Sequence, residues 1–198
     1  MSDVFEIKET REGIIIEKYI GNDTDVVVPE SINGLPVIAI GDNAFKNNEK
    51  LEHVDLPETI TTLGESVFEG CTNLEFFVMP NSVEKMGCYC FTNCVSLKTA
   101  TLSDKLTEIP YWTYNGCINL QGVSIPSSVQ EFNYFVFSKC PSTLTFFCEP
   151  NSYALSCALP FRKECISKSL ENVLGDDCYV STSGQAHSRE HSVEELCM

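Results

Sequence analysis

The sequence is poor in basic residues, and this scarcity limits its partners. Lys and Arg number 13 against 28 Asp and Glu in 198 residues, which gives a net charge of −15. Nucleic-acid backbones and anionic membrane surfaces are bound through clustered Lys and Arg, and no stretch of this chain supplies such a cluster. We therefore expect no nucleic-acid partner and no membrane insertion, and partners that are neutral or basic.

Histidine is scarce as well, with three residues in the chain. Acid–base or nucleophilic catalysis needs a base beside the reacting group, but His187 and His191 lie near the C-terminus and His53 is predicted on an open sheet. A Gly-rich phosphate loop is also lacking. We predict no enzyme, no catalytic residue and no cofactor. His187 and His191 could hold a metal on a helix, but their polar flanks favour a solvated tail, so no metal is predicted.

Long apolar runs are missing, and the longest falls far short of the roughly 20 residues that cross a bilayer. The N-terminal residues 1–6 have neither the basic nor the apolar region of a secretory signal. Together with an odd number of cysteines, 11, this predicts a cytoplasmic location, and the recurrence of a cysteine once per coil, described below, predicts reduced thiols. The alternative is the cell surface or secretion, if a signal has been removed from the sequence.

What the sequence does contain is a 23-residue repeat that runs in several columns at once. The apolar residue of a Leu-Pro-like pair, an aromatic ring, a cysteine and a leucine each recur at this step. The columns are Leu56, Met79, Leu102 and Ile125; Phe45, Phe68, Phe91, Tyr114 and Phe137; Cys71, Cys94, Cys117 and Cys140; Leu51, Leu74, Leu97 and Leu120, with Leu144 one residue late. Such self-similarity is the signature of a solenoid.

Each coil is predicted to be extended rather than helical. In the second coil the alternation of Val54 and Leu56 places both side chains inward, so that His53 and Asp55 face outward. Pro57 ends this strand, where no ladder donor is needed. The pattern therefore predicts a mainly β repeat solenoid with short turns or helices.

Both ends of the solenoid are predicted to be capped. Residues 1–24 read as a β-hairpin, which covers the first coil, and residues 25–150 as about five coils. Asn151 and Ser152 resemble a helix N-cap, and apolar residues from Phe161 to Leu174 recur at helical spacing, so residues 151–175 are predicted to form a short helical cap. Residues 176–198 are polar and predicted to be disordered.

The sequence motifs of the repeat resemble those of a known family. Residues 56–74, Leu-Pro-Glu-Thr-Ile-Thr-Thr-Leu-Gly-Glu-Ser-Val-Phe-Glu-Gly-Cys-Thr-Asn-Leu, and residues 40–45, Ile-Gly-Asp-Asn-Ala-Phe, are similar to the BspA-like leucine-rich-repeat family. The resemblance covers roughly residues 20–160. It implies a right-handed leucine-rich-repeat coil with a parallel sheet on the concave face. It also implies an adhesion or interaction role without a shared catalytic residue.

The first candidate site is a run of rings just before the aromatic column, which we call the aromatic edge: Tyr89, Tyr111, Trp112, Tyr134 and Phe135. The second coil has Glu65 and Ser66 at these two positions, which predicts that both lie on the surface. Exposed rings supply a large contact area at low entropic cost. Alternatively, the rings cover their own coils or pack under the C-terminal segment.

The second candidate is the outward face of the main sheet. Its predicted residues are Asp25, Val27, His53, Asp55, Phe76, Val78, Thr99, Thr101, Gly122, Ser124 and Phe146. Phe76 is the one obvious anchor for a protein contact or for self-association. An idle sheet face is the alternative.

The cysteine columns are interpreted as structural. The ladder thiols recur at one position per coil, so they are predicted to fill space and to bond weakly to loop backbone. Cys88, Cys90 and Cys94 resemble a ligand cluster, but two of them are inward positions of the repeat and zinc prefers four ligands. The whole chain is therefore predicted to be a non-enzymatic protein-binding module with an unidentified protein partner. A self-assembling structural protein, hence a homo-oligomer, is the alternative, and a carbohydrate-binding module is a weaker one.

Overall fold

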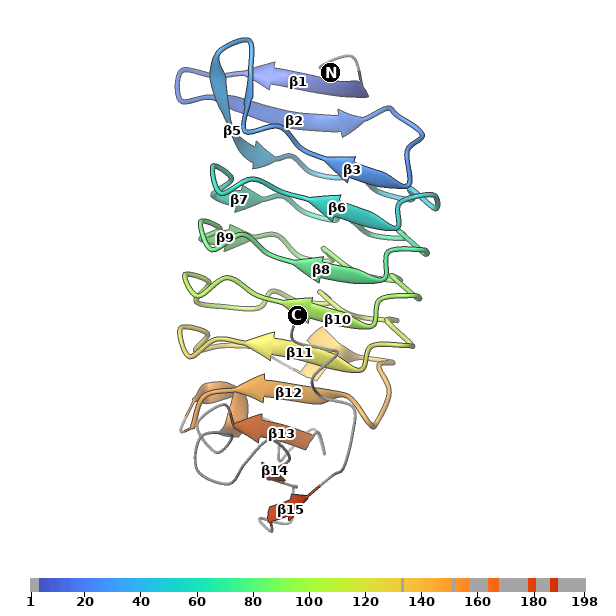
Figure 1. The fold of residues 1–198 in the computed structure, drawn as a ribbon, viewed down its shortest axis with the longest axis vertical. Coiled ribbons are helices and arrows are strands. Elements are labelled where there is room, and N and C mark those ends of the chain that lie inside the picture. The colour runs from blue at the N-terminus through green and yellow to red at the C-terminus, as the bar shows by residue number, and fades with distance from the viewer. Residues whose placement is uncertain are drawn as a thin grey trace.

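The computed structural model describes most of the repeat and a few elements beyond it. The described residues are 4–132, 134–150 and 152–156, with the backbone alone for Tyr134 and for the strands Glu164–Ser167, Cys178–Val180 and Ala186–Ser188. The coils stack along the long axis of the molecule (Figure 1). The chain forms a β-solenoid of about six turns with parallel sheets and very little helix, which confirms the predicted fold class.

One face of the solenoid carries a short parallel strand from each coil (Figure 1). These strands are β3 (Asp25–Val27), β6 (His53–Asp55), β8 (Phe76–Val78), β10 (Thr99–Thr101), β11 (Gly122–Ile125) and β12 (Thr145–Cys148). Phe76 pairs with Thr99, and Thr99 with Gly122. The 23-residue repeat of the sequence is thus the register of the sheet.

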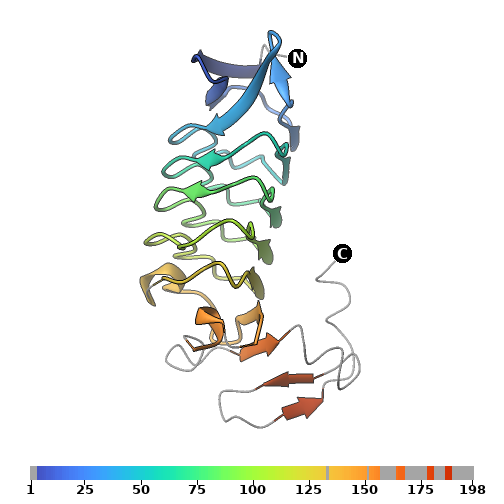
Figure 2. The ribbon, with the colours of Figure 1, turned by 90° about the vertical axis from the view of Figure 1, so that its left-hand side faces the viewer.

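A second series of parallel strands lies on the other side of the coils (Figure 2). It runs through β2 (Ile14–Tyr19), β5 (Leu35–Ile40), β7 (Thr62–Leu63) and β9 (Lys85–Met86). β1 (Phe5–Glu9) pairs antiparallel with β2, so the predicted hairpin forms the N-terminal edge of this sheet. The longer first repeat makes a small hairpin of β4 (Ser31–Ile32) and β5, closed by an Asn33-Gly34 turn.

The second series ends where a proline replaces a glycine. Gly64 and Gly87 each donate their N–H to the preceding coil, to the carbonyls of Ile40 at 2.8 Å and Leu63 at 2.9 Å. A Cβ at Gly87 would lie 2.6 Å from the backbone of the coil before it. Pro110 occupies the next position of this column and has no N–H to donate. Beyond β9 the pairing is reduced to one isolated bridge, between Glu108 and Glu131.

The core is a stack of aromatic rings along the solenoid axis. Successive ring centroids lie 5.3–5.4 Å apart with interplanar angles between 3° and 26°. The stack contains Tyr19, Phe45, Phe68, Phe91, Tyr114 and Phe137, all buried. The hairpin cap thus supplies the first ring, Tyr19, and the predicted column supplies the other five. Offset ring pairs of this kind stabilise a core by about 0.5–1.5 kcal/mol each beyond their burial.

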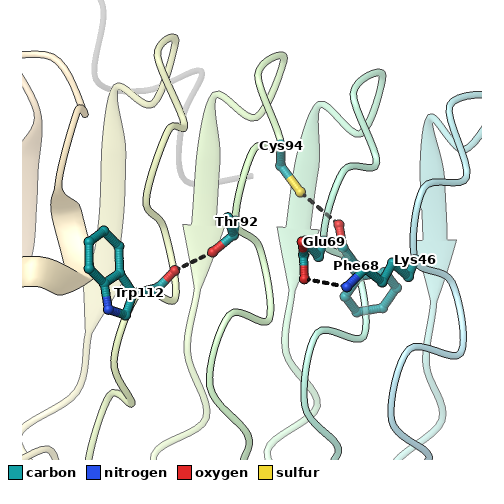
Figure 3. Close-up of polar contacts among 6 residues, drawn as sticks. All are labelled: Lys46, Phe68, Glu69, Thr92, Cys94 and Trp112. Atoms are coloured by element: carbon teal, nitrogen blue, oxygen red, sulfur yellow. Dashed lines mark hydrogen bonds and ion pairs between the residues drawn. The ribbon is translucent and has the colours of Figure 1, made fainter.

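The cysteine column runs beside the rings, and its thiols form hydrogen bonds with the backbone of the ring residues. Each thiol donates to the backbone carbonyl of the ring residue one coil earlier, at 3.0–3.1 Å. Figure 3 shows one of these bonds, from Cys94 to Phe68. The four thiols are free, which confirms their predicted structural role. Cys148 differs, because it is disulfide-bonded. The prediction that all thiols are reduced is therefore wrong at Cys148, which lies outside the column on which that prediction rested.

The C-terminal cap differs from its prediction. Residues 153–156 form a short helix, and the Ser152 hydroxyl accepts the N–H of Leu155 at 3.3 Å, as an N-cap does. The predicted second helix is contradicted at β13 (Glu164–Ser167), a strand that pairs parallel with β12. A parallel edge strand leaves unpaired N–H and C=O groups, and pairing with them overrides the local helical spacing. Residues 176–198, predicted to be disordered, include β14 (Cys178–Val180) and β15 (Ala186–Ser188).

Among the five stacked rings of the repeat, Tyr114 is the only tyrosine. We expect its hydroxyl to lower the stability of the fold. Its oxygen is buried without a hydrogen-bond partner among the described residues. An orphan buried hydroxyl costs about 1–3 kcal/mol. Tyr114→Phe should therefore raise the free energy of unfolding by about 1 kcal/mol, measured by urea titration. The matched change Phe91→Tyr, one coil away, should lower it; shifts of the same sign for both changes, or the reverse of these two signs, would contradict this account.

The buried thiols predict a loss of stability in alkali. Burial raises the pKa of Cys71 and of Cys90 from 9.0 to about 12. Between pH 9 and about pH 12, these thiols have lost their protons in the unfolded chain but keep them in the folded chain. The free energy of unfolding should therefore be fully retained below pH 9 and fall at higher pH by about 1.4 kcal/mol per pH unit for each such thiol.

Urea titrations from pH 7 to pH 11 would measure this slope. Cys71→Ala, which removes one of the thiols, should reduce the slope by one thiol's share whatever its effect at pH 7. An unchanged slope in this variant would show that the alkaline loss comes from other groups.

Candidate functional site

Tyr89, Tyr111 and Trp112 of the aromatic edge lie on a turn whose backbone is left-handed at two positions in each of four coils. The first position has φ between 55° and 62°, and its residues are Asn43, Ser66, Tyr89 and Trp112. The second lies four residues later, with φ between 59° and 79°, and its residues are Asn47, Gly70, Asn93 and Gly116, followed by Lys139 at 63°. N–H groups of this turn donate to carbonyls of the next coil, for example from Tyr89 to Tyr111 at 3.1 Å. The turn is thereby held in register with its neighbours.

Tyr89 and Trp112 occupy a backbone conformation that favours other residues. Asn and Gly are common at φ near +60°, whereas a bulky side chain there costs roughly 1–2 kcal/mol. Contacts from neighbouring residues stabilise Trp112 in this state. Its carbonyl accepts the hydroxyl of Thr92 at 2.5 Å, seen in Figure 3, and the N–H of Asn115 at 3.2 Å. Both rings are thus presented from unfavourable backbone positions, and the carbonyl of Trp112 is held by two hydrogen bonds.

The rings of the aromatic edge differ in exposure. Tyr111 is 57% exposed and Tyr89 is 38% exposed. Trp112 and Phe135 are partly buried and stack on each other, with centroids 5.2 Å apart and planes at 21°. The structure thus brings Trp112 and Phe135 together and leaves two tyrosines at the surface. The side chain of Tyr134 lies outside the described residues, although its backbone opens the 3-10 helix η2 (Tyr134–Phe137).

One step of the sequence argument for this edge is wrong. Ser66 was expected on the surface because it is polar, but only 4% of it is exposed. The polar residue at this position was therefore no sign of exposure to water. Glu65, the neighbouring position of the same coil, is exposed as expected.

The sheet face holds Phe76 between two basic side chains. The ring is 40% exposed, with the His53 ring 6.4 Å away on one side and the Lys98 Nζ 5.3 Å from its centroid on the other. Each of these two side chains contacts a carboxylate. His53 Nδ1 lies 3.1 Å from Asp25, and Lys98 Nζ lies 2.8 Å from Glu75. The sequence argument missed Lys98, although it stands 23 residues after Glu75 and next to the Thr99 strand.

The last strand of this face is shifted by one residue from its prediction. Phe146 was expected to point outward, but it is fully buried. Phe147 pairs with the outward Ser124, and its ring lies over Gly122, where a Cβ would approach it to 2.6 Å. The shift follows from Leu144, which comes one residue late, because one residue exchanges the two faces of a strand.

The cysteine cluster has the properties of packing residues. Cys90 and Cys94 are buried and Cys88 is partly exposed. Burial raises the pKa of Cys94 well above its usual value, so its thiol stays protonated, whereas zinc binds thiolate. In the described part of the chain, no three His, Cys, Asp or Glu side chains gather at a metal-binding distance. His187 falls in β15, a strand rather than a helix, and His191 lies outside the described residues.

No helix of the described residues has the length and apolar character needed to cross a membrane.

Comparisons with known proteins agree on one family of repeats. The model of the BspA-type leucine-rich repeat region matches residues 38–157 in six copies, against the five or so coils expected from the sequence. A leucine-rich repeat protein of T. pallidum is 31% identical, with a TM-score of 0.71 over 74% of this chain and 70% of that one. No curated protein matches the chain.

Two further solved structures share the fold at lower identity. A leucine-rich repeat protein from Eubacterium ventriosum is 24% identical, with a TM-score of 0.61, and the match covers 74% of this chain and 40% of that one. A leucine-rich cell surface protein from Faecalibacterium prausnitzii is 20% identical, with a TM-score of 0.58 over 96% of this chain and 60% of that one.

The left-handed turn predicts an inverted glycine effect at Tyr89. Glycine normally destabilises relative to alanine, but at φ 62° it avoids the strain of a Cβ. Tyr89→Gly should therefore be more stable than Tyr89→Ala by about 1 kcal/mol. At Tyr111, which lacks a positive φ, Tyr111→Gly should be the less stable of the matched pair. Thermal unfolding of the four variants measures both differences in stability between the glycine and the alanine variant. If this difference had the same sign at Tyr89 and at Tyr111, the left-handed conformation of Tyr89 would be refuted.

Proposed function

Because the chain belongs to the BspA-type leucine-rich repeat family, we propose that it is a non-enzymatic protein-binding module whose contact surface is the aromatic edge. The family is one of repeat proteins whose solved relatives are bacterial leucine-rich repeat proteins. A solenoid offers a long surface on which neighbouring coils present side chains in rows. The aromatic edge is such a row.

The observation that carries the proposal is the placement of Tyr89 and Trp112. Both hold rings at left-handed positions, where Asn43 and Ser66 satisfy the same turn in the first coils. Rings at these positions lower the stability of the fold, and unfavourable backbone conformations cluster at functional sites. With Tyr111 more than half exposed, the row combines the residue types that dominate protein interfaces.

A protein partner accounts for this row better than a sugar does. Protein interfaces are enriched in Tyr, Trp and Phe around a buried centre, and the Trp112–Phe135 pair, already half-buried, supplies such a centre. The two exposed tyrosines then lie at its border. Binding of a glycan through the same rings remains the weaker alternative.

Self-association through the sheet face is the second candidate, and one observation favours it. Val27 and Val78 are each 69% exposed, and Phe76 lies beside Val78 on the same strand. Apolar side chains of this size on an open face suit contact with a second copy of the chain. The aromatic edge and the sheet face are separate surfaces, so variants can distinguish them.

A capture experiment under reducing conditions tests the proposal. The full chain would be immobilised and exposed to lysate of the source organism, beside an edge variant with Tyr89→Gly, Tyr111→Ser and Trp112→Asn. These replacements suit their backbone positions, so the variant should keep the circular dichroism spectrum of the wild type. We expect a partner that the wild type captures and the edge variant loses by tenfold or more, since each anchor contributes about 1–2 kcal/mol or more.

The matched control is Phe76→Ser with Val78→Ser on the sheet face, which should retain the partner. Loss of the partner in this control alone would move the contact to the sheet face and refute the proposal. Light scattering decides the self-association candidate: a mass above 22.1 kDa that the control variant abolishes would support it, and a monomer at high concentration would remove it.

A further inference from the structure

We propose that the partner presents an arginine or lysine side chain to the aromatic edge, where it lies on the rings and pairs with Glu108 and Glu131. This inference rests on the proposed function, because it assigns the chemistry of the contact at the same surface. It predicts a basic peptide segment as the partner, rather than an apolar or acidic one. The aromatic rings carry the proposal, and the two carboxylates decide the charge of what binds.

The repeat places the two carboxylates at the same position of successive coils, shortly before the rings in the sequence. Glu108 and Glu131 face each other in the isolated parallel bridge that follows β9, and both are exposed. Each stands three residues before a residue of the aromatic edge, Tyr111 in one coil and Tyr134 in the next. Parallel neighbours of this kind are about 4.8 Å apart, so two like charges directly precede the ring-bearing turn along the chain.

These two charges are uncompensated in the described part of the chain. Among the described residues, three acidic side chains form ion pairs: Asp25 with His53, Glu69 with Lys46 at 2.9 Å (Figure 3) and Glu75 with Lys98 at 2.8 Å. Glu108 and Glu131 take part in no ion pair among the described residues, and Lys85, one coil before Glu108, is not within pairing distance. Like charges directly opposite each other in a sheet are unfavourable. A bound cation would relieve this repulsion.

The rings favour the same type of ligand. The faces of Trp and Tyr attract cations, and the guanidinium of arginine also stacks flat on them. Tyr111 is more than half exposed and Trp112 is presented on a held backbone, so both can receive such a group. A guanidinium can contact a ring with its face and a carboxylate with its edge at the same time. The net charge of −15 would speed the approach of a basic segment.

The N-terminal end of the same edge lacks this combination of rings and carboxylates. In the first coils the turn carries Asn43 and Ser66 instead of rings, and its acidic Glu69 is paired with Lys46. At the position of Glu108 and Glu131 the two preceding coils carry Thr62 and Lys85, so within the described residues a carboxylate at this position and rings on the following turn occur together from the coil of Tyr111 onward. A basic segment should therefore bind at the C-terminal half of the edge.

A peptide titration tests the inference directly. The probe is the acetylated and amidated peptide Gly-Arg-Gly-Arg-Gly, and its neutral isostere has citrulline in place of each arginine. Binding to the full chain would be followed by the fluorescence of Trp112, the single tryptophan, and by calorimetry at 150 mM salt. We expect the arginine peptide to bind and to change the fluorescence, and the citrulline peptide to bind at least threefold more weakly.

Paired charge variants separate the site from the net charge. Glu108→Gln with Glu131→Gln should weaken binding of the arginine peptide about threefold or more, as two exposed ion pairs allow. The control, Glu12→Gln with Glu17→Gln, removes the same charge from exposed residues of the hairpin cap and should leave affinity nearly unchanged. Equal weakening by both pairs, or equal binding of the citrulline peptide, would overturn the inference.

The failure of this inference is distinguishable from that of the proposed function. A partner protein that is lost by the edge variant but bound equally well after Glu108→Gln with Glu131→Gln would keep the aromatic edge as the site and refute a basic ligand. Binding of the arginine peptide by the edge variant at full affinity would refute the inference as well, because the rings would then take no part.

Discussion

Each coil of this protein is stabilised by contact with its two neighbours, and the constraint behind that contact is a constant 23-residue step. The step brings like positions next to each other, so that rings stack on rings at 5.3–5.4 Å and backbone donors meet carbonyls one coil away. The thiol of each column cysteine then bonds to the carbonyl of the previous ring residue. A coil that kept its residues but lost the step would lose all three contacts together.

The same constraint dictates how the ends and irregular places are built. Tyr19 of the hairpin continues the ring stack at the N-terminus, and β13 continues the parallel sheet at the C-terminus, because both edges of a solenoid expose unpaired groups. Where Pro110 removes a donor, the second sheet ends. That interruption directly precedes Tyr111 and Trp112, so the break in the second sheet and the proposed contact surface adjoin.

Regular stacking also limits where a surface can vary. Inward positions must match their neighbours in size, and the left-handed turns favour Asn or Gly. Rings at two of these turn positions act against the stability of the fold, which is the reason to attribute a role to them. Their neighbours Glu108 and Glu131 are also unfavourable to each other. Two separate costs at one edge are better explained by binding than by folding.

The sequence by itself determined the repeat, its register, the core columns and the hairpin cap, because a strict period leaves one way to align Phe45, Phe68 and Phe91. It also predicted that Tyr111 would be exposed and that the ladder thiols would be buried. Only the tertiary structure decided that Ser66 is buried, that residues 164–167 extend a sheet, and that Phe147 rather than Phe146 lies on the outer side of its strand, where it too is buried. Those outcomes depend on hydrogen bonds and contacts between coils, and the pattern of residues within a single coil does not predict them.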